Sequence, residues 1–204
     1  MKYSDIDPRK TAFIFELDNV LYPEKDYLFQ VYYLFTSFLE YTELVDAKEA
    51  TDLMVNTYIK EGKDAVFNTL AAKYAVAGNY RDNFENLCIT AKLPLKLLLY
   101  QGMLNLLQDI VVDRKHIFIV TNGNPVQQLN KIKQTEWNGL EPYLTCYFAN
   151  ETLPKPETDS IHLLIKEHDL QRKNMVMIGN SDTDVFCAEA AGIDYIETEK
   201  FIQV

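Results

Sequence analysis

Carboxylate side chains in this sequence stand where an apolar run ends, so a buried strand would carry them to the edge of a sheet. Glu16 and Asp18 lie at the end of the run Thr11–Leu17 (TAFIFEL). Two carboxylates beside a buried strand are costly unless each is paired with a cation or binds a metal ion. This pair therefore predicts an ion-pair or metal site at the end of the first strand.

A second chemical feature follows the run His116–Asn122. Thr121, Asn122 and Gly123 offer a hydroxyl group and backbone N–H groups directly before a predicted helix. Such groups at a helix N-terminus suit a phosphate. The plainer interpretation is a helix cap with a tight turn, and the turn alone does not decide between the two.

Two further stretches complete a series of polar strand ends. Lys155 follows the third apolar run, and Asn180, Asp182 and Asp184 follow the fourth, again before a predicted helix. Taken alone, the lysine is a solvated loop residue and the acidic turn is a helix N-cap. Because ligands bind beyond the carboxyl ends of parallel strands, the order of these groups predicts that they cluster on one edge of a sheet.

The elements that would position these groups alternate between strands and helices. Nearly continuous runs of Ile, Val, Phe and Met are typical of strands covered on both faces. Helices are predicted where apolar residues recur every three or four positions, as Val126, Leu129 and Ile132 do. This alternation predicts a doubly wound α/β sheet. The predicted strands are Thr11–Leu17, His116–Asn122, Thr145–Asn150, Asn174–Asn180 and Asp194–Thr198, and the predicted helices are Pro125–Lys133, Ser160–His168 and Thr183–Ala191.

One long segment interrupts the alternation. From about Asp26 to Leu99 no strand run occurs, and apolar residues such as Leu28, Val31 and Phe35 recur with the helical period. The segment predicts a four-helix insertion after the first strand. Its many aromatic side chains are expected to fill a second core rather than to hold a ligand.

Composition limits the class of protein and partner. A net charge of −10, from 20 basic and 30 acidic side chains, argues against a nucleic-acid polymer because like charges repel. Three separated cysteines without a CxxC pair fit a reducing compartment. No apolar run is long enough to span a membrane, and the first residues do not resemble a secretory signal. These features predict a cytoplasmic protein with no membrane partner, while the oligomeric state is not visible in the sequence.

Together, the strand-end stretches resemble the four motifs of the haloacid dehalogenase superfamily of hydrolases. Its first motif, DxDx[TV][LV], corresponds to Glu16–Leu21 (ELDNVL). Its second motif, a Ser or Thr at a strand end, corresponds to Thr121, and its third motif to Lys155. Its fourth, GDxxxD-like motif corresponds to Gly179–Asp184 (GNSDTD), followed by Ala188–Gly192 (AEAAG). The resemblance covers nearly the whole chain.

The resemblance implies a Rossmann-like three-layer fold with a parallel sheet of strand order 5-4-1-2-3 and a helical cap inserted after the first strand. Residues 1–22 and 99–204 would form the core domain, and residues 23–98 the cap domain. It also implies magnesium-dependent hydrolysis of a small phosphomonoester. The stretch Asp18–Pro23 (DNVLYP) is similar to the pyrimidine 5′-nucleotidase branch, in which the substrate is a nucleotide.

The family pattern also implies roles for individual residues. Glu16 takes the position of the nucleophile, and Asp18 takes that of the general acid, which later activates water as a base. The phosphate-binding residues would be Thr121, Asn122, Gly123 and Lys155. The magnesium ligands would be Glu16, Asp18 through its backbone carbonyl, Asn180 and Asp184.

Two positions depart from the family pattern. The family has Asp where this chain has Glu16. Unless its torsions fold it back, the added methylene group moves the carboxylate by about 1 Å or more, a displacement that can cost on the order of 10²-fold or more in rate. Asn180 stands where the family usually has an acidic metal ligand, and its amide oxygen supplies no negative charge. Weakened Mg²⁺ binding is therefore expected, with Asp182 as a substitute acid close by.

These departures leave three hypotheses. The chain is a phosphatase of small phosphomonoesters that tolerates the changes. Alternatively, it is a catalytically silent family member that binds a phosphorylated ligand or a protein partner, with a Glu16–Lys155 ion pair closing the pocket. The third hypothesis is that Glu16 is not the natural residue at its position.

Overall fold

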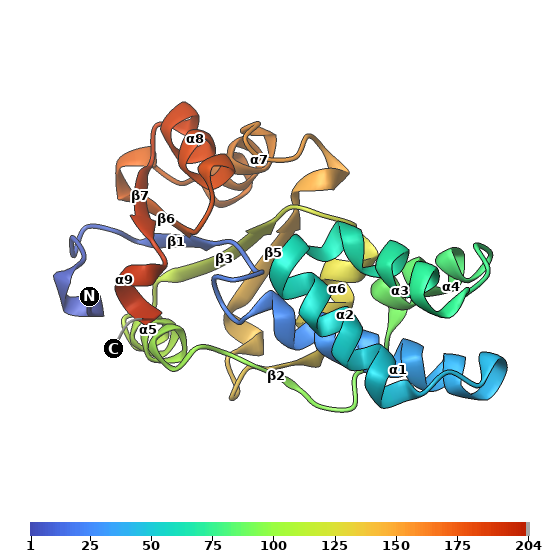
Figure 1. Cartoon of the computed structure of the whole chain (residues 1–204). Helices are drawn as coiled ribbons and strands as arrows, with labels where there is room; N and C mark the ends of the chain where they lie inside the picture. The colour runs from blue at the N-terminus through green and yellow to red at the C-terminus, as the bar shows by residue number, and fades with distance from the viewer. Residues whose placement is uncertain (203–204) are drawn as a thin grey trace. The chain divides into compact units, whose positions relative to one another are not determined.

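The computed structural model of the protein describes residues 1–202. The chain divides into two compact units, Met1–Glu24 with Leu97–Val204, and Lys25–Lys96. Figure 1 shows the sheet in the first unit and the helices α1 to α4 of the second. All the residues named above as candidates for catalysis lie in the first unit.

The first unit is built on a five-stranded parallel sheet. Its strands lie in the order β5-β3-β1-β6-β7, and each neighbouring pair is parallel. This arrangement confirms the predicted order 5-4-1-2-3, read in the reverse direction. The strands are β1 (Ala12–Phe15), β3 (His116–Thr121), β5 (Leu144–Phe148), β6 (Met175–Gly179) and β7 (Asp194–Glu197).

The central strand β1 is fully buried along its whole length. Its last residue, Phe15, stands beside Ile119 of β3 and Ile178 of β6. Because the three strands are parallel and in register, the residues that follow them emerge at the same edge. Glu16, Thr121 and Gly179 therefore come together at the carboxyl edge, as the sequence predicts.

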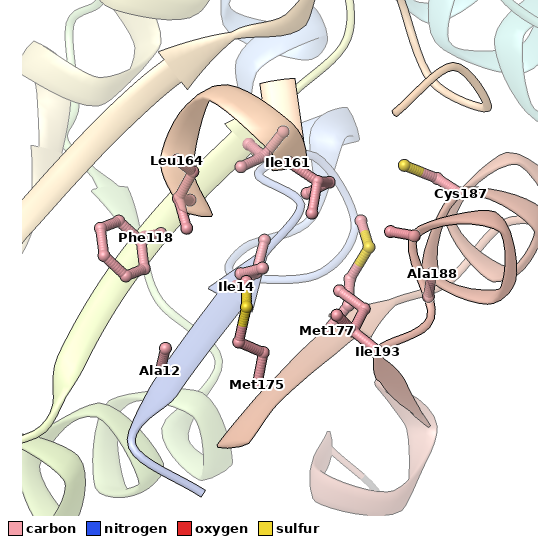
Figure 2. Packing of buried hydrophobic residues seen from close by; sticks show 12 residues of the cluster. Ala12, Ile14, Phe118, Ile161, Leu164, Met175, Met177, Cys187, Ala188 and Ile193 are labelled. Atoms are coloured by element: carbon pink, nitrogen blue, oxygen red, sulfur yellow. The ribbon is translucent and has the colours of Figure 1, made fainter. Parts of the chain in front are cut away.

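Helices cover both faces of this sheet. On one face, α7 (Asp159–His168) and α8 (Asp182–Ala191) pack on β1, β3 and β6 through a cluster of buried apolar side chains, which includes Ile14, Phe118 and Met177. Figure 2 shows Ile161 and Leu164 of α7 pointing at this cluster, with Cys187 and Ala188 of α8 beside it. On the other side, α5 (Gln101–Val112) contacts β3 and the short helix α9 (Glu199–Ile202).

Helix α6 (Pro125–Gln134) follows β3 and is the exception to this apolar packing. Asn124 caps it, since its side chain accepts hydrogen bonds from the backbone N–H groups of the first turn. The apolar repeat that marks the helix in the sequence does not form its buried side, because Val126 is 59% exposed and Leu129 is 39% exposed. The buried residues of α6 are instead Gln128 and Lys131.

The second unit consists of α-helices, as the periodicity predicts. Their packing is largely aromatic, with Phe84 in ring contact with Tyr32, Phe35 and Phe67. These contacts confirm an aromatic core in this segment, although Tyr33 and Tyr41 of the same segment are exposed. The helices are α1 (Glu24–Glu43), α2 (Ala47–Glu61), α3 (Val66–Tyr74) and α4 (Tyr80–Thr90).

The remaining elements are short. A two-stranded parallel pair joins β2 (Leu97–Leu98) to β4 (Thr135–Glu136). None of the helices within residues 1–202 has the length and apolar character needed to cross a membrane. Single turns of 3₁₀-helix lie at Tyr3–Asp5, Lys63–Ala65, Glu141–Tyr143, Ala149–Glu151 and Arg172–Asn174.

Candidate active site

A tight turn after β1 sets the direction of the first acidic pair. Asn19 adopts a left-handed backbone conformation, with φ at 60°, which asparagine tolerates better than most residues. Its backbone N–H donates to the carbonyl of Tyr22 at 2.9 Å. The turn brings the Tyr22 hydroxyl to the Asp18 carboxylate, where it donates to Oδ1 at 2.9 Å.

The carboxylate of Glu16 is almost fully buried and is held by three donors. The Lys155 ammonium group donates to Oε2 at 2.6 Å, and the backbone N–H of Asn122 approaches the same oxygen at 3.3 Å. The backbone N–H of Leu17 donates to Oε1 at 2.7 Å. The side chain therefore folds back over its own backbone, and the ion pair expected between Glu16 and Lys155 is present.

Lys155 has no exposed side-chain area and bridges two carboxylates. Its Nζ atom lies 2.6 Å from Glu16 Oε2 and 2.5 Å from Asp184 Oδ1. Burial acts to lower the pKa of this ammonium group, but the two adjacent carboxylates outweigh it and hold the pKa above its usual value. Asn122 fixes the lysine loop by exchanging two 2.9 Å hydrogen bonds with the Lys155 backbone. Lys155 is therefore a buried ion-pair partner and not a solvated loop lysine.

Asp184 reaches this lysine from the first turn of α8. The Ser181 hydroxyl and the Asn180 backbone N–H donate to its Oδ2 atom at 2.7 and 3.2 Å. A Cβ atom on Gly179 would lie 2.6 Å from the Cβ atom of Asp184. The end of β6 must therefore be glycine for the Asp184 carboxylate to sit against it.

The polar side of α6 holds the second acidic residue of the pair. Lys131 is 3% exposed at its side chain and places Nζ 2.6 Å from Asp18 Oδ2. Gln128 Nε2 donates to the same oxygen at 3.0 Å. With the Tyr22 hydroxyl on Oδ1, both oxygens of Asp18 accept hydrogen bonds from side chains of the protein.

The donors predicted to hold a phosphoryl group also have partners within the chain. Thr121 Oγ1 accepts a 2.7 Å hydrogen bond from Gln128 Nε2. The backbone N–H of Gly123 donates to Asn150 Oδ1 at 2.8 Å. Gly123 has φ at 113°, a conformation that only glycine adopts without strain. The turn is therefore shaped as a cradle, and side chains of this protein fill it.

The structure brings Glu16, Asp18, Lys155 and Asp184 together with the threonine turn. The charged groups of the site are the carboxylates of Glu16, Asp18 and Asp184 and the ammonium groups of Lys131 and Lys155. The remaining predicted ligand, Asn180, is exposed, as is Asp182. These two side chains stand at the surface while Asp184 is buried.

The predicted magnesium ligands are Glu16, the Asp18 backbone carbonyl, Asn180 and Asp184, and only two of these four are acidic side chains. Across residues 1–202, no three or more His, Cys, Asp or Glu side chains are grouped to hold a metal ion. The ammonium group of Lys155 lies between Glu16 and Asp184 and balances part of their charge. Asn180 adds no negative charge that would favour a divalent cation over the lysine. With two acidic side chains and a neighbouring ammonium group, the site is expected to bind Mg²⁺ only weakly.

Three residues of the site, Gln128, Lys131 and Asn150, are not among those predicted. The apolar repeat of α6 favours Val126 and Leu129 as the buried residues of this helix, although both are exposed. A signal did exist, since a glutamine and a lysine three residues apart lie on one face of a helix. Asn150 likewise ends the third predicted strand, at the same edge as the other polar groups.

Comparison with known proteins identifies the family. Residues 13–198 match the family model described as haloacid dehalogenase-like hydrolase. A phosphoglycolate phosphatase of Photobacterium profundum is 35% identical over 75 residues, which cover 36% of this chain and 31% of that protein. This chain thus matches less than a third of the length of that relative.

Solved structures share the fold at low sequence identity. A HAD-superfamily hydrolase of subfamily IA from Geobacter sulfurreducens gives a TM-score of 0.60 at 17% identity, over 93% of this chain and 87% of that one. A HAD-hydrolase from Bacillus subtilis, solved with magnesium bound, gives a TM-score of 0.57 at 17% identity, over 92% and 86% of the two chains. At such identity the similarity supports the architecture only.

Proposed function

Because this chain belongs to the haloacid dehalogenase-like hydrolase family, we propose that it binds a small phosphomonoester at the carboxyl edge of its sheet. We propose further that the chain hydrolyses this ligand at a strongly suppressed rate, so that binding is its main activity. The expected suppression is at least about 10²-fold, the cost of misplacing an attacking group by about 1 Å.

The observation that carries this proposal is the hydrogen bonding of Asp18. A general acid must hold a proton on one carboxyl oxygen and direct it at the leaving group. Here Oδ2 accepts hydrogen bonds from Lys131 and Gln128, and Oδ1 accepts one from Tyr22. An ammonium group and an amide N–H only donate, so they leave no place for a proton on Oδ2. A proton on Oδ1 would be directed at the Tyr22 hydroxyl and not at a leaving group.

Glu16 supports the same conclusion. Its Oε2 atom accepts from Lys155 and from the Asn122 N–H, two of the donors expected to hold phosphoryl oxygens. The longer side chain thus occupies part of the space of the group it would attack. A bound phosphoryl oxygen has to compete with this carboxylate, so we expect modest affinity together with poor in-line geometry.

The ligand class follows from the donors themselves. A buried lysine, a threonine hydroxyl and the backbone N–H groups of a glycine turn recognise a compact anion with several oxygens. A phosphate monoester presents three such oxygens. Nucleotides belong to this class, and the similarity of Asp18–Pro23 to the pyrimidine nucleotidase branch places them first in a ligand panel.

The proposal is tested by measuring binding and turnover on the same preparation of the full chain. Isothermal titration with inorganic phosphate and nucleoside monophosphates measures binding. Release of phosphate from p-nitrophenyl phosphate and from the nucleotides, with Mg²⁺ present, measures turnover. We expect millimolar or tighter binding, together with slow phosphate release that Asp18→Asn does not abolish.

Two results would contradict the proposal. Phosphate release that Asp18→Asn abolishes would show that Asp18 works as an acid in the native site. Absence of binding by inorganic phosphate and by every phosphomonoester tested would show that the cradle does not take a phosphoryl group. Lys133→Met, at an exposed position of the same helix α6, is the control variant and should behave as the unmodified chain in both assays.

A second candidate function is magnesium-dependent hydrolysis of a small phosphomonoester. The presence of Asp18, Thr121, Lys155 and Asp184 at one edge favours it, as does the stretch similar to a phosphoglycolate phosphatase. This candidate requires Glu16, Asp184 and the Asn180 amide to bind Mg²⁺ although Lys155 already balances part of the carboxylate charge. Turnover by the unmodified chain that a chelator abolishes would establish it over the binding function.

A further inference from the structure

The amide group of Gln128 lies against the turn Thr121–Gly123, which is predicted to hold a phosphate. Gln128 is 2% exposed, and its Nε2 atom donates to Thr121 Oγ1 at 2.7 Å and to the Asn122 carbonyl at 3.0 Å. Its Cδ atom lies 3.6 Å from the point where a Cβ on Gly123 would stand. The amide therefore packs against all three residues of the turn.

We propose that Gln128 is a built-in plug of the phosphate cradle, and that a phosphoryl group binds by displacing its amide from Thr121. This inference rests on the proposed binding function and adds to it a positioning residue that limits access. It concerns the side chain of α6 that follows the turn, which belongs to none of the four motifs.

The hydrogen bonds fix which end of the amide enters the cradle. Thr121 Oγ1, the Asn122 carbonyl and Asp18 Oδ2 all lie within 3.0 Å of Nε2. A carbonyl and a carboxylate accept hydrogen bonds and cannot donate, so the nitrogen atom must face them. The carbonyl oxygen Oε1 is consequently directed elsewhere.

That carbonyl oxygen makes the plugged position imperfect. Gln128 Oε1 is buried and has no hydrogen-bond partner within the part of the chain that the structure describes. A buried polar atom without a partner is destabilising. Rotation of the side chain out of the cradle would expose Oε1 to water, so displacement by a ligand loses hydrogen bonds at Nε2 but gains solvation at Oε1. This balance makes an exchange between amide and phosphate feasible.

Displacement would also free the groups that a phosphate needs. The Thr121 hydroxyl accepts from Gln128 and donates to the Asn122 carbonyl at 3.3 Å, so its hydrogen is not available to a ligand. Without the amide, the hydroxyl can turn and donate to a phosphoryl oxygen. Asp18 would lose one of its three donors at the same time and keep those from Lys131 and Tyr22.

The test compares inorganic phosphate binding by the full chain and by variants of α6. Gln128→Ala removes the plug, and we expect its dissociation constant for phosphate to be about tenfold lower than that of the unmodified chain (about 1.4 kcal/mol). Gln128→Met keeps most of the volume but has no amide, and a roughly threefold decrease is expected. Gln127→Ala, at the neighbouring position of the same helix, should leave the dissociation constant unchanged. Titration calorimetry and phosphorus NMR give the constants, and circular dichroism confirms that each variant is folded.

Each outcome bears on the plug. Tighter binding by either folded Gln128 variant supports it, so failure of one variant to fold leaves the other to decide. Equal or weaker binding by both variants overturns the plug but leaves the proposed function standing, because phosphate still binds. Absence of phosphate binding by the unmodified chain and by both variants overturns the plug and the proposed function together.

Discussion

Replacing Lys131 with methionine should destabilise the sheet-containing unit by about 3 kcal/mol. Removing one partner of a buried ion pair costs about 3 to 5 kcal/mol, because the other charge is left without compensation. Lys131 is 3% exposed at its side chain and Asp18 is 18% exposed. Asp18 also keeps the donors from Tyr22 and Gln128, so the lower end of the range applies. Methionine fills the space of the lysine stem, and no cavity is added.

Trp137 offers a local probe for this measurement. It is the only tryptophan of the chain, is 2% exposed, and donates from Nε1 to the carbonyl of Ile132 in α6 at 2.8 Å. Its fluorescence during urea unfolding therefore reports on the unit that contains the site. The control, Lys133→Met, changes an exposed lysine of the same helix, and its free energy of unfolding should stay within about 0.5 kcal/mol of the original.

A double-mutant cycle with Asp18→Asn separates the ion pair from packing. If the pair is the cause, the loss caused by Lys131→Met should shrink by about 2 kcal/mol once Asp18 is neutral. An equal loss in both backgrounds would refute the reasoning, because the lysine would then stabilise the fold through contacts unrelated to Asp18. A loss below about 1 kcal/mol would show that the pair is solvated in solution.

Three further predictions concern the metal, the glycine of β6 and the half-buried thiol of Cys146. The double variant Glu16→Asp with Asn180→Asp restores the family's acidic residues, and calorimetry should detect tighter Mg²⁺ binding by it than by the unmodified chain. Equal Mg²⁺ affinities would contradict this. Gly179→Ala should lower the free energy of unfolding by about 1 to 3 kcal/mol, because the new methyl group would stand 2.6 Å from the Cβ atom of Asp184, and an unchanged urea midpoint would contradict it. Burial raises the pKa of the Cys146 thiol to about 11. Since the thiolate is the reactive form, the reaction of Cys146 with a disulfide reagent, measured against Cys146→Ser, should accelerate about tenfold per pH unit between pH 8 and 10. A rate that levels off in that range would contradict a raised thiol pKa.

The sheet could be predicted from sequence because each of its signals is local and redundant. The strands β1, β3 and β6 are nearly continuous in Ile, Val, Phe and Met, and burial on both faces explains that composition. Their polar termini mark the carboxyl edge without reference to any contact. The strand order followed from the resemblance to the family, and periodicity alone would have left it open.

The partners of the candidate site could not be predicted in the same way. The pairing of Glu16 with Lys155 was expected because both occupy motif positions. The pairing of Asp18 with Lys131 depends on how far α6 is rotated about its axis. Successive side chains on a helix are about 100° apart around its axis, so a rotation of the helix by one residue position moves a side chain from the sheet to solvent. Sequence spacing does not determine how far the helix is rotated against the sheet.

The inverted burial of α6 is best understood as a consequence of the residues that it must compensate. The carboxylate of Asp18 and the hydroxyl of Thr121 both lie at the end of buried strands, so an apolar face of α6 would leave them without hydrogen bonds. Gln128 and Lys131 supply those bonds, while Val126 and Leu129 lie toward solvent. In a site open to a ligand and a metal ion, these would supply the hydrogen bonds and the charge that Asp18 and Thr121 require. Here the helix provides it, which is why the same two residues stabilise the fold and restrict the chemistry.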